Sequence, residues 1–184
     1  MPKALLVIAQ GCEELEAVTI IDLLRRAGIE VLAAGLTPGP VRAGRGVTLL
    51  PDCELEEVMG DEDIDMVVLP GGLPGADNLA NDARVRTLLT AMTEAGKFVA
   101  AICAAPRVLA KLGLLDGKRA TAYPGFIDGG DFPAITYTGA PVERDGRLIT
   151  GRGPGTAMDF GLELIEVLMD RETRNTVEKG LVRP

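Results

Sequence analysis

The sequence predicts an α/β protein with a flavodoxin-like three-layer arrangement, in which a mostly parallel sheet has helices on both faces. Short apolar or mostly apolar segments at 4–9, 29–34, 65–69 and 98–102 have the length of buried strands. Helix-length segments separate these runs, as right-handed βαβ crossovers require. A chain of 184 residues suits one core of this kind, so we expect a single domain spanning 1–184.

The first half of the chain alternates between strand and helix patterns. After the strand at 4–9, the segment 13–27 places its apolar side chains on one face, and Gly28 ends the helix. In order, we then expect a strand at 29–34, a brief strand at 47–50 and a short acidic helix at 53–59 with Cys53 at its cap.

The second half begins with the buried strand at 65–69, which ends in Pro70-Gly71-Gly72. Two glycines there let the backbone approach a neighbouring group closely. Asn81-Asp82 breaks the helix at 77–96, because Asp82 can cap the second part. The remaining expected elements are a strand at 98–102, a helix from 104 to Gly113, strands at 118–123 and 136–138, a hairpin of 142–144 and 147–150 around Asp145-Gly146, and helices at 157–169 and 171–182.

Cys103 lies on the turn between the strand at 98–102 and the next helix, where a nucleophile elbow is found in α/β enzymes. Ala104 is small enough for a tight turn, and Pro106 suits a first helical turn because no N–H is needed there. Unpaired N–H groups and the helix dipole are expected to favour the thiolate. A second interpretation stays open, in which Cys103 is a buried small apolar residue.

Glu16 occupies an unusual place for a carboxylate. It lies on the apolar stripe of the first helix, one turn before Ile20, so it is expected to point toward the sheet edge. Glu13 and Glu14 lie in the first turn and complement the helix dipole. The same dipole effect is the alternative explanation for Glu16, beside a functional role.

Composition and charge exclude several classes of protein. Hydrophobic residues make up 47% and charged residues 25% of the chain, close to the average for soluble globular proteins. No apolar run approaches the ~18 residues of a spanning helix, and the chain opens on a strand pattern, so we expect a cytoplasmic protein without membrane attachment. A net charge of −8 without a basic cluster argues against a general nucleic-acid surface.

The chain has three cysteines and no histidine. The spacing of Cys12, Cys53 and Cys103 indicates neither a metal motif nor a disulfide framework, and reduced thiols are expected. Without histidine, Cys-His and Ser-His catalysis and histidine-ligated metals are excluded. The glycine-rich turn at 151–156 lacks the phosphate-binding patterns. We therefore expect no cofactor and no metal.

Six segments occur together in a characteristic order and spacing. They are G-C-E-E-L-E-A at 11–17, R-R-A-G-I at 25–29, R-G-V-T-L-L-P-D at 45–52, V-V-L-P-G-G at 67–72, A-A-I-C-A-A-P at 100–106 and T-G-R-G-P-G-T-A-M-D-F at 150–160. This set resembles the ThiJ/PfpI superfamily nearly end to end, in the branch of the parkinsonism-associated deglycase and its bacterial relatives of the YajL type.

The resemblance assigns roles to particular residues. The reactive nucleophile of the family falls on Cys103 and its partner acid on Glu16. The backbone donors beside the thiol fall on Gly72 and Ala104. Arg45 matches an arginine that in relatives reaches the pocket near the dimer interface.

The sequence departs from the family pattern at Tyr123-Pro124, where many relatives have a histidine before the proline. We place Tyr123 in the pocket. Without an imidazole base, protease and amidotransferase chemistry are not expected.

These observations lead to a mechanistic hypothesis. Two negative charges would repel, so Glu16 is expected to stay protonated and to donate to a Cys103 thiolate. The resemblance implies small 2-oxoaldehydes, or their early glycation adducts on proteins and nucleotides, as substrates of a glyoxalase- or deglycase-like enzyme. The alternative is an oxidative-stress sensor or redox-regulated chaperone acting through a sulfinate at Cys103. The second apolar face of the first helix (Leu15, Val18, Ile21) and the resemblance predict a homodimer.

Overall fold

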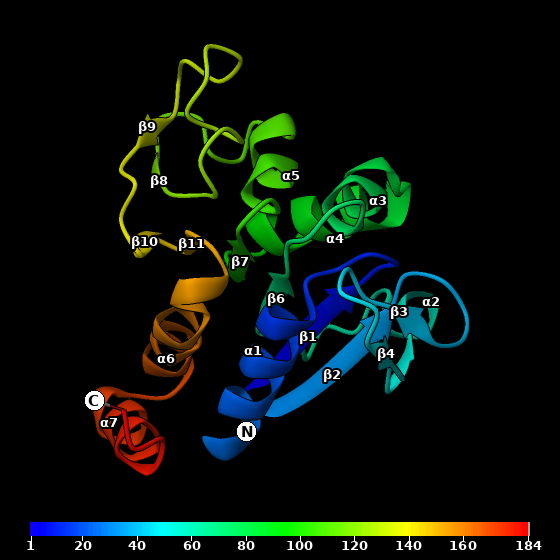
Figure 1. Cartoon of the computed structure of the whole chain (residues 1–184), viewed down its shortest axis with the longest axis vertical. Helices are drawn as coiled ribbons and strands as arrows, with labels where there is room; N and C mark the ends of the chain where they lie inside the picture. Colours follow the sequence, from blue (N-terminus) through cyan, green and yellow to red (C-terminus); the bar gives the residue numbers. More distant parts are fainter. Residues whose placement is uncertain (184) are drawn as a thin grey trace.

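A computed structural model describes residues 1–183 and shows a seven-stranded sheet with helices on both faces (Figure 1). The strand order is β10-β11-β7-β6-β1-β2-β5. The sheet strands are β1 (Lys3–Ile8), β2 (Glu30–Gly35), β5 (Cys53–Glu54), β6 (Met66–Leu69), β7 (Phe98–Ile102), β10 (Val142–Asp145) and β11 (Leu148–Gly151). All neighbours pair in parallel except the β10–β11 hairpin. The predicted α/β fold with a mostly parallel sheet is confirmed.

The helices divide between the two faces of the sheet. The helices are α1 (Glu14–Arg26), α2 (Leu55–Val58), α3 (Gly75–Asn81), α4 (Ala83–Glu94), α5 (Pro106–Lys111), α6 (Ala157–Leu168) and α7 (Arg171–Gly180), with a 3-10 turn at Pro154–Thr156. Buried side chains of α1, α6 and α7 form one core cluster, and those of α2, α3, α4 and α5 form the other. In Figure 1, α1 and α6 accordingly lie together, away from α3, α4 and α5.

The central strand β1 shows why the sheet needs both helical layers. Leu5 and Val7 are fully buried in one cluster, whereas Leu6 and Ile8 are buried in the other. Successive side chains of a strand point to opposite faces, so an uninterrupted apolar strand requires cover on each side. The apolar runs that predicted buried strands have this physical basis.

Local capping sets the helix boundaries near the site. The side chain of Glu13 caps α1 by accepting from the N–H of Leu15. Asp82 accepts from the N–H of Arg84 at 2.8 Å and separates α3 from α4, which confirms the break predicted at that position.

Three of the expected elements are shorter than predicted or differ in kind. Cys53 lies in strand β5 rather than at a helix cap, because its strand extends the sheet beside β2, and Glu54 is the N-cap of α2 instead. Helix α5 starts at Pro106, since the residues after Cys103 form a turn. The strand expected at 118–123 is reduced to β8 (Arg119–Ala120), which pairs with β9 (Thr136–Tyr137) outside the main sheet.

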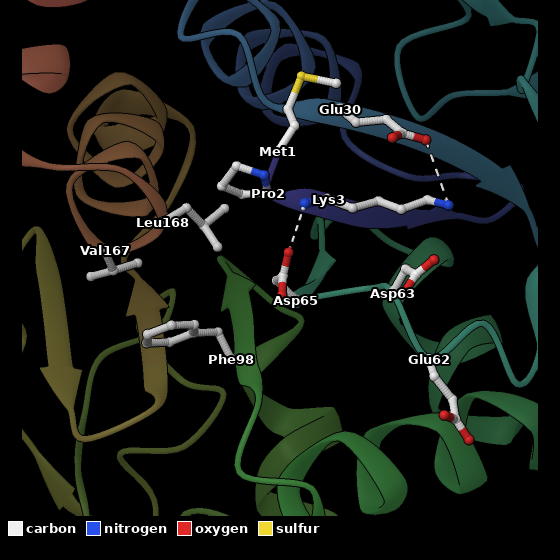
Figure 2. Close-up of a pocket in the computed structure, with 10 residues that line it drawn as sticks. All are labelled: Met1, Pro2, Lys3, Glu30, Glu62, Asp63, Asp65, Phe98, Val167 and Leu168. Carbon is white, nitrogen blue, oxygen red and sulfur yellow. Dashed lines mark hydrogen bonds and ion pairs between the residues drawn. The ribbon is translucent and has the colours of Figure 1, made fainter.

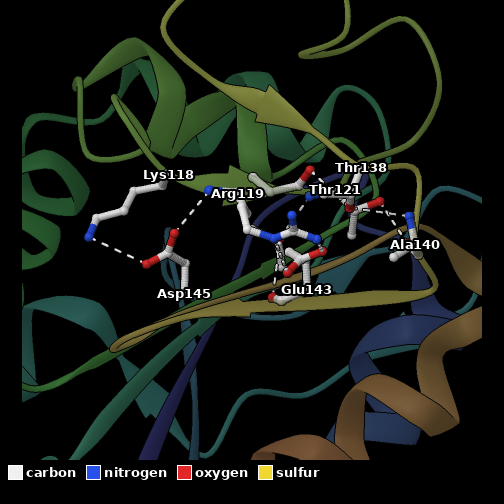
Figure 3. Close-up of polar contacts among 9 residues, drawn as sticks. Lys118, Arg119, Thr121, Thr138, Ala140, Glu143 and Asp145 are labelled. Carbon is white, nitrogen blue, oxygen red and sulfur yellow. Dashed lines mark hydrogen bonds and ion pairs between the residues drawn. The ribbon is translucent and has the colours of Figure 1, made fainter.

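A polar network explains why the segment 118–123 is not a longer strand (Figure 3). The N–H of Thr121 donates to the Thr150 hydroxyl at 2.9 Å, and the Thr121 hydroxyl donates to the Ala140 carbonyl at 2.7 Å. At the start of the segment, Arg119 donates through its N–H to Asp145. These contacts replace strand pairing beyond Ala120, and the chain then crosses β11 toward the end of β7.

The remaining short strands, β3 (Val41–Arg42) and β4 (Thr48–Leu49), form an antiparallel ribbon. The strand predicted at 47–50 corresponds to β4. Glu14 at the start of α1 accepts from the N–H groups of Arg45 and Val47, which holds the turn of this ribbon beside the helix. Among residues 1–183, no helix has both the length and the apolar character that a membrane crossing requires.

Candidate functional site

The elbow at Cys103 is a strained turn at the carboxyl end of β7. Cys103 has a φ of 65°, in the left-handed region that side chains other than glycine rarely adopt. Such a conformation costs roughly 1–3 kcal/mol and persists only where the surroundings enforce it. Here the N–H of Cys103 donates to the Gly151 carbonyl of β11 at 2.9 Å, and its carbonyl accepts from Tyr123 at 2.8 Å.

A glycine loop after β6 lies directly against this elbow. A Cβ on Gly71 would stand 2.7 Å from the Cβ of Cys103 and 2.9 Å from the N of Ala104. A Cβ on Gly72 would stand 2.4 Å from the N of Glu13, and the φ of Gly72 is 86°. Both positions therefore exclude larger residues, and the loop joins the start of α1 to the elbow.

Glu16 lies behind the thiol, at the position that its helical phase predicts. Its side chain is fully buried, and Oε2 accepts from the N–H of Gly71 at 2.8 Å. Among residues 1–183, Oε1 of Glu16 is the one buried side-chain polar atom without a hydrogen-bond partner. Burial raises the pKa of Glu16 to about 7, although the Gly71 N–H and the Cys103 thiol act to lower it.

The thiol itself differs from the expectation drawn from the sequence. Burial is the largest influence, followed by the charge of the Glu16 carboxylate, and together they raise the pKa of Cys103 to about 12. The N–H groups of Gly72 and Ala104 lower the pKa as predicted, but burial outweighs them. Because the repulsion exists only while Glu16 is ionised, protonation of Glu16 relieves it and favours the thiolate.

A pocket of about 380 Å³ opens over the thiol. Its lining includes five of the six residues singled out from the sequence: Arg45, Gly72, Cys103, Ala104 and Tyr123. Glu16 is enclosed beneath them. The structure thus brings all six residues together around one pocket, while their chemical roles stay predictions.

Two contributors to this site were not singled out from the sequence. Gly71 supplies the N–H that holds Glu16, although the double glycine was itself a visible signal of close approach. Phe126 lines the pocket beside Tyr123, and its ring meets the Tyr123 ring edge-on at 85° with centroids 6.2 Å apart. Phe126 lies in a loop without periodicity, so the sequence gives no signal for its position.

A larger hollow of about 780 Å³ lies at the opposite, amino-terminal end of the strands (Figure 2). The polar groups of Lys3 have partners there. Its backbone N–H donates to Asp65 at 2.9 Å, and its ammonium group lies 3.5 Å from the Glu30 carboxylate. Within residues 1–183, this hollow contains neither a cysteine nor a buried polar atom without a partner. We therefore place the candidate site at the thiol pocket.

The other two cysteines lie outside this pocket. Cys12 is fully buried, and burial raises the pKa of its thiol to about 11. Cys53 lines a separate hollow at the edge strand β5. Among residues 1–183, no group of three or more His, Cys, Asp or Glu side chains is arranged to hold a metal ion.

The fold and the site together define an α/β protein with a cysteine on a strained strand-to-helix turn, backed by a buried acid. Residues 2–167 match the DJ-1/PfpI family. Protein dj-1beta of Drosophila melanogaster is 44% identical over 98% of this chain and 96% of its own length. The glutathione-independent glyoxalase DJR-1.2 of Caenorhabditis elegans is 34% identical over 94% of this chain and 91% of its own.

A solved structure agrees over the same extent. Oxidized DJ-1 of Toxoplasma gondii superposes with a TM-score of 0.93 at 40% identity, covering 99% of this chain and 98% of that one. The chain therefore belongs to the DJ-1/PfpI family. Its identity of 40–44% to these DJ-1 proteins, over nearly the full length, places it in the DJ-1 branch. The resemblance carried by the six sequence motifs is confirmed.

The close approach at Gly71 leads to a first prediction. In Gly71→Ala, the new methyl group collides with the Cβ of Cys103 and the backbone N of Ala104. Neither atom belongs to a flexible side-chain end that could rotate away. We expect a loss of about 1–3 kcal/mol in the free energy of unfolding and slower alkylation of Cys103. Gly129→Ala, where a Cβ meets open space, is the control. Equal stability and equal alkylation in the two variants would contradict this account of the elbow.

The buried acid leads to a prediction about pH. The pKa of Glu16 is about 7 in the folded protein and near 4.5 when unfolded, so the folded state binds more protons between these values. Stability must then fall as pH rises through this window, by roughly 3 kcal/mol in total. Urea unfolding at about pH 5 and about pH 8 is expected to show most of this loss in the wild type and little of it in Glu16→Gln. Glu94→Gln, an exposed substitution on α4, serves as control, and an unchanged pH dependence in Glu16→Gln would refute the assignment.

Proposed function

We propose that this protein converts small 2-oxoaldehydes, such as glyoxal and methylglyoxal, to 2-hydroxy acids through Cys103, without a cofactor. The observation that carries the proposal is the pairing of a pocket-lining thiol with a buried acid whose Oε1 has no other partner among residues 1–183. A relative with 34% identity is named a glutathione-independent glyoxalase, which supports the same reaction class.

The geometry suggests where the proton of the pair resides. Oε2 of Glu16 accepts from Gly71, so a proton on Glu16 belongs on Oε1. From there it can be donated toward the Cys103 sulfur, which stabilises a thiolate without histidine. The N–H groups of Gly72 and Ala104 add to this stabilisation. Glu16 and Cys103 thus share one proton, which Glu16 can transfer to the substrate during the reaction.

The first chemical step is addition of the thiolate to the aldehyde carbon. The new S–C bond pushes the carbonyl electron pair onto oxygen, which the N–H groups of Gly72 and Ala104 stabilise and Glu16 protonates. The product is a hemithioacetal. Glu16 is now ionised and can act as a base beside the adduct.

The reaction closes by proton transfer and hydrolysis. Glu16 removes the hydrogen from the former aldehyde carbon and delivers it to the neighbouring carbonyl carbon, and the hydroxyl proton moves to the second oxygen. The hemithioacetal thereby becomes the thioester of a 2-hydroxy acid. Water attacks the thioester carbon and gives one proton to Glu16, and the sulfur leaves as the thiolate. The 2-hydroxy acid is released with the other proton, which it then loses to solvent. Early glycation adducts that present the same carbonyl carbon are the related substrates we propose.

Turnover of methylglyoxal by the purified protein tests this proposal. Cys103→Ala is expected to abolish formation of lactate, whereas Cys53→Ala, whose thiol lines a different hollow, keeps the wild-type rate. Glu16→Gln is expected to lower kcat at least about a hundredfold, since general acid–base catalysis contributes that much. Wild-type turnover in Cys103→Ala would refute the enzymatic mechanism.

The alternative function is a peroxide sensor or redox-regulated chaperone that acts through oxidation of Cys103. One feature that favours it is that Cys103 opens to a pocket whereas Cys12 is fully buried, so oxidation would be selective. Absence of methylglyoxal turnover in the wild type, together with selective formation of a Cys103 sulfinate at low peroxide, would establish this function in place of the enzyme.

We also propose that the protein is a homodimer through the outer face of α1. Leu15 and Val18 are 50% and 48% exposed there, and Val47 of the neighbouring ribbon is 49% exposed. Val18→Glu introduces a charge into this face and is expected to shift sedimentation from dimer to monomer at micromolar concentration. Met158→Glu, an exposed apolar position on α6, is the control. A monomeric wild type would contradict the proposal.

A further inference from the structure

A chain of side-chain contacts runs from helix α3 to the thiol pocket. Asp77 of α3 accepts a hydrogen bond from the guanidinium of Arg107 on α5. The same guanidinium lies over the ring of Phe126, with its carbon 5.0 Å from the ring centroid. Phe126 in turn meets Tyr123 edge-on, at a centroid distance of 6.2 Å. None of these contacts is used in the mechanism above.

Backbone hydrogen bonds connect Tyr123, Phe126 and Arg107 to the elbow. The N–H of Tyr123 donates to the carbonyl of Cys103 at 2.8 Å, and the N–H of Phe126 donates to the carbonyl of Tyr123 at 3.2 Å. Arg107 follows Cys103 by one helical turn, and its N–H donates to the carbonyl of Ala104. The two rings are therefore placed relative to the thiol by the turn itself and by the Arg107 side chain.

The rings form a wall of the pocket: Tyr123 is half-exposed, and Phe126 is partly buried against the core. Tyr123 and Phe126 both line the thiol pocket of about 380 Å³. Tyr123 also borders an adjoining hollow of about 300 Å³, which it shares with Arg152 and Pro154. A three-carbon oxoaldehyde fills only a small part of this space. The site has room for a substrate that extends from the thiol along the two rings.

Aromatic walls discriminate by shape and by surface. Edge-to-face and offset-stacked contacts favour flat unsaturated groups over small alkyl groups, beyond the area that is buried. This selectivity requires that the rings keep a fixed orientation. A guanidinium over the face of Phe126, itself tethered by Asp77, provides such a restraint at a half-exposed position.

We propose that Arg107 is a positioning residue that holds Phe126 and Tyr123 as an aromatic wall, and that this wall makes the thiol pocket selective for carbonyl substrates with an aryl or conjugated substituent. The substrate class rests on the proposed function, whereas the selectivity of the pocket does not. The wall acts on any electrophile that reaches Cys103.

Alkylation of Cys103 tests the wall without requiring turnover. The probes are iodoacetamide and iodoacetanilide, which carry the same reactive group without and with a phenyl ring, respectively. Peptide mass spectrometry measures the rate of alkylation at Cys103. We expect the wild type to prefer iodoacetanilide, relative to the same pair reacting with a small free thiol. In Phe126→Leu, which keeps an apolar group of similar size, the preference is expected to fall about two- to tenfold.

The role of Arg107 is tested by a graded series. Arg107→Met keeps the length of the side chain but removes the cation, and it is expected to lower the preference about two- to fivefold without changing the rate with iodoacetamide. Arg107→Lys restores a cation and is expected to recover part of the preference. Arg86→Met, at an exposed position on α4, is the matched control and keeps the wild-type preference.

Turnover then tests the substrate class. The wild type is expected to have a higher kcat/KM for phenylglyoxal than for methylglyoxal, and Arg107→Met is expected to raise KM for phenylglyoxal with little change in kcat. The proposed aromatic wall would be refuted if the wild type and Phe126→Leu showed the same preference for iodoacetanilide. It would also be refuted if Phe126→Leu slowed alkylation of Cys103 by both probes to the same extent. Failure of the wild type to turn over either aldehyde would refute the proposed function, while the alkylation result still decides the inference.

Discussion

The hydrogen bond from the N–H of Gly71 to Oε2 of Glu16 is the interaction on which the site depends. It is 2.8 Å long, fully buried, and joins the loop after β6 to helix α1. It occupies one carboxyl oxygen and leaves Oε1 buried without a hydrogen-bond partner among residues 1–183. It also partly offsets the burial of Glu16, whose pKa would otherwise rise further. Removing this contact would free the carboxyl group to turn away from Cys103.

Close backbone approach makes this interaction possible. Gly71 and Gly72 lie where any Cβ would collide with the elbow or with the start of α1. The elbow itself is held in a left-handed conformation by its hydrogen bonds to Gly151 and Tyr123. The left-handed turn at Cys103 and the absence of a Cβ at the two glycines together allow the close backbone contact at the site. It brings three chain segments to the same sheet edge, as parallel strand ends allow.

The site combines residues held by the central sheet with two aromatic residues from an irregular loop. The thiol, the acid and the amide donors come from α1 and from the ends of β6 and β7, which the sheet holds rigidly. Tyr123 and Phe126 come from the irregular segment after β8, which side-chain hydrogen bonds and Arg107 keep in place. The sheet therefore positions the thiol and the acid, whereas the loop shapes the pocket above them.

The sequence by itself determined the α/β fold, because apolar runs of strand length and capped amphipathic helices are local patterns. It also singled out Cys103 from its strand-to-helix turn and Glu16 from its helical phase, since both signals lie within one element. Tertiary structure alone decided that only Arg119–Ala120 of the 118–123 segment form a strand, and that Phe126 lines the thiol pocket. It also decided that burial and Glu16 raise the pKa of Cys103, where the local pattern predicted a lower value. Desolvation and charge repulsion depend on what packs around a group, and no pattern within one segment contains that information.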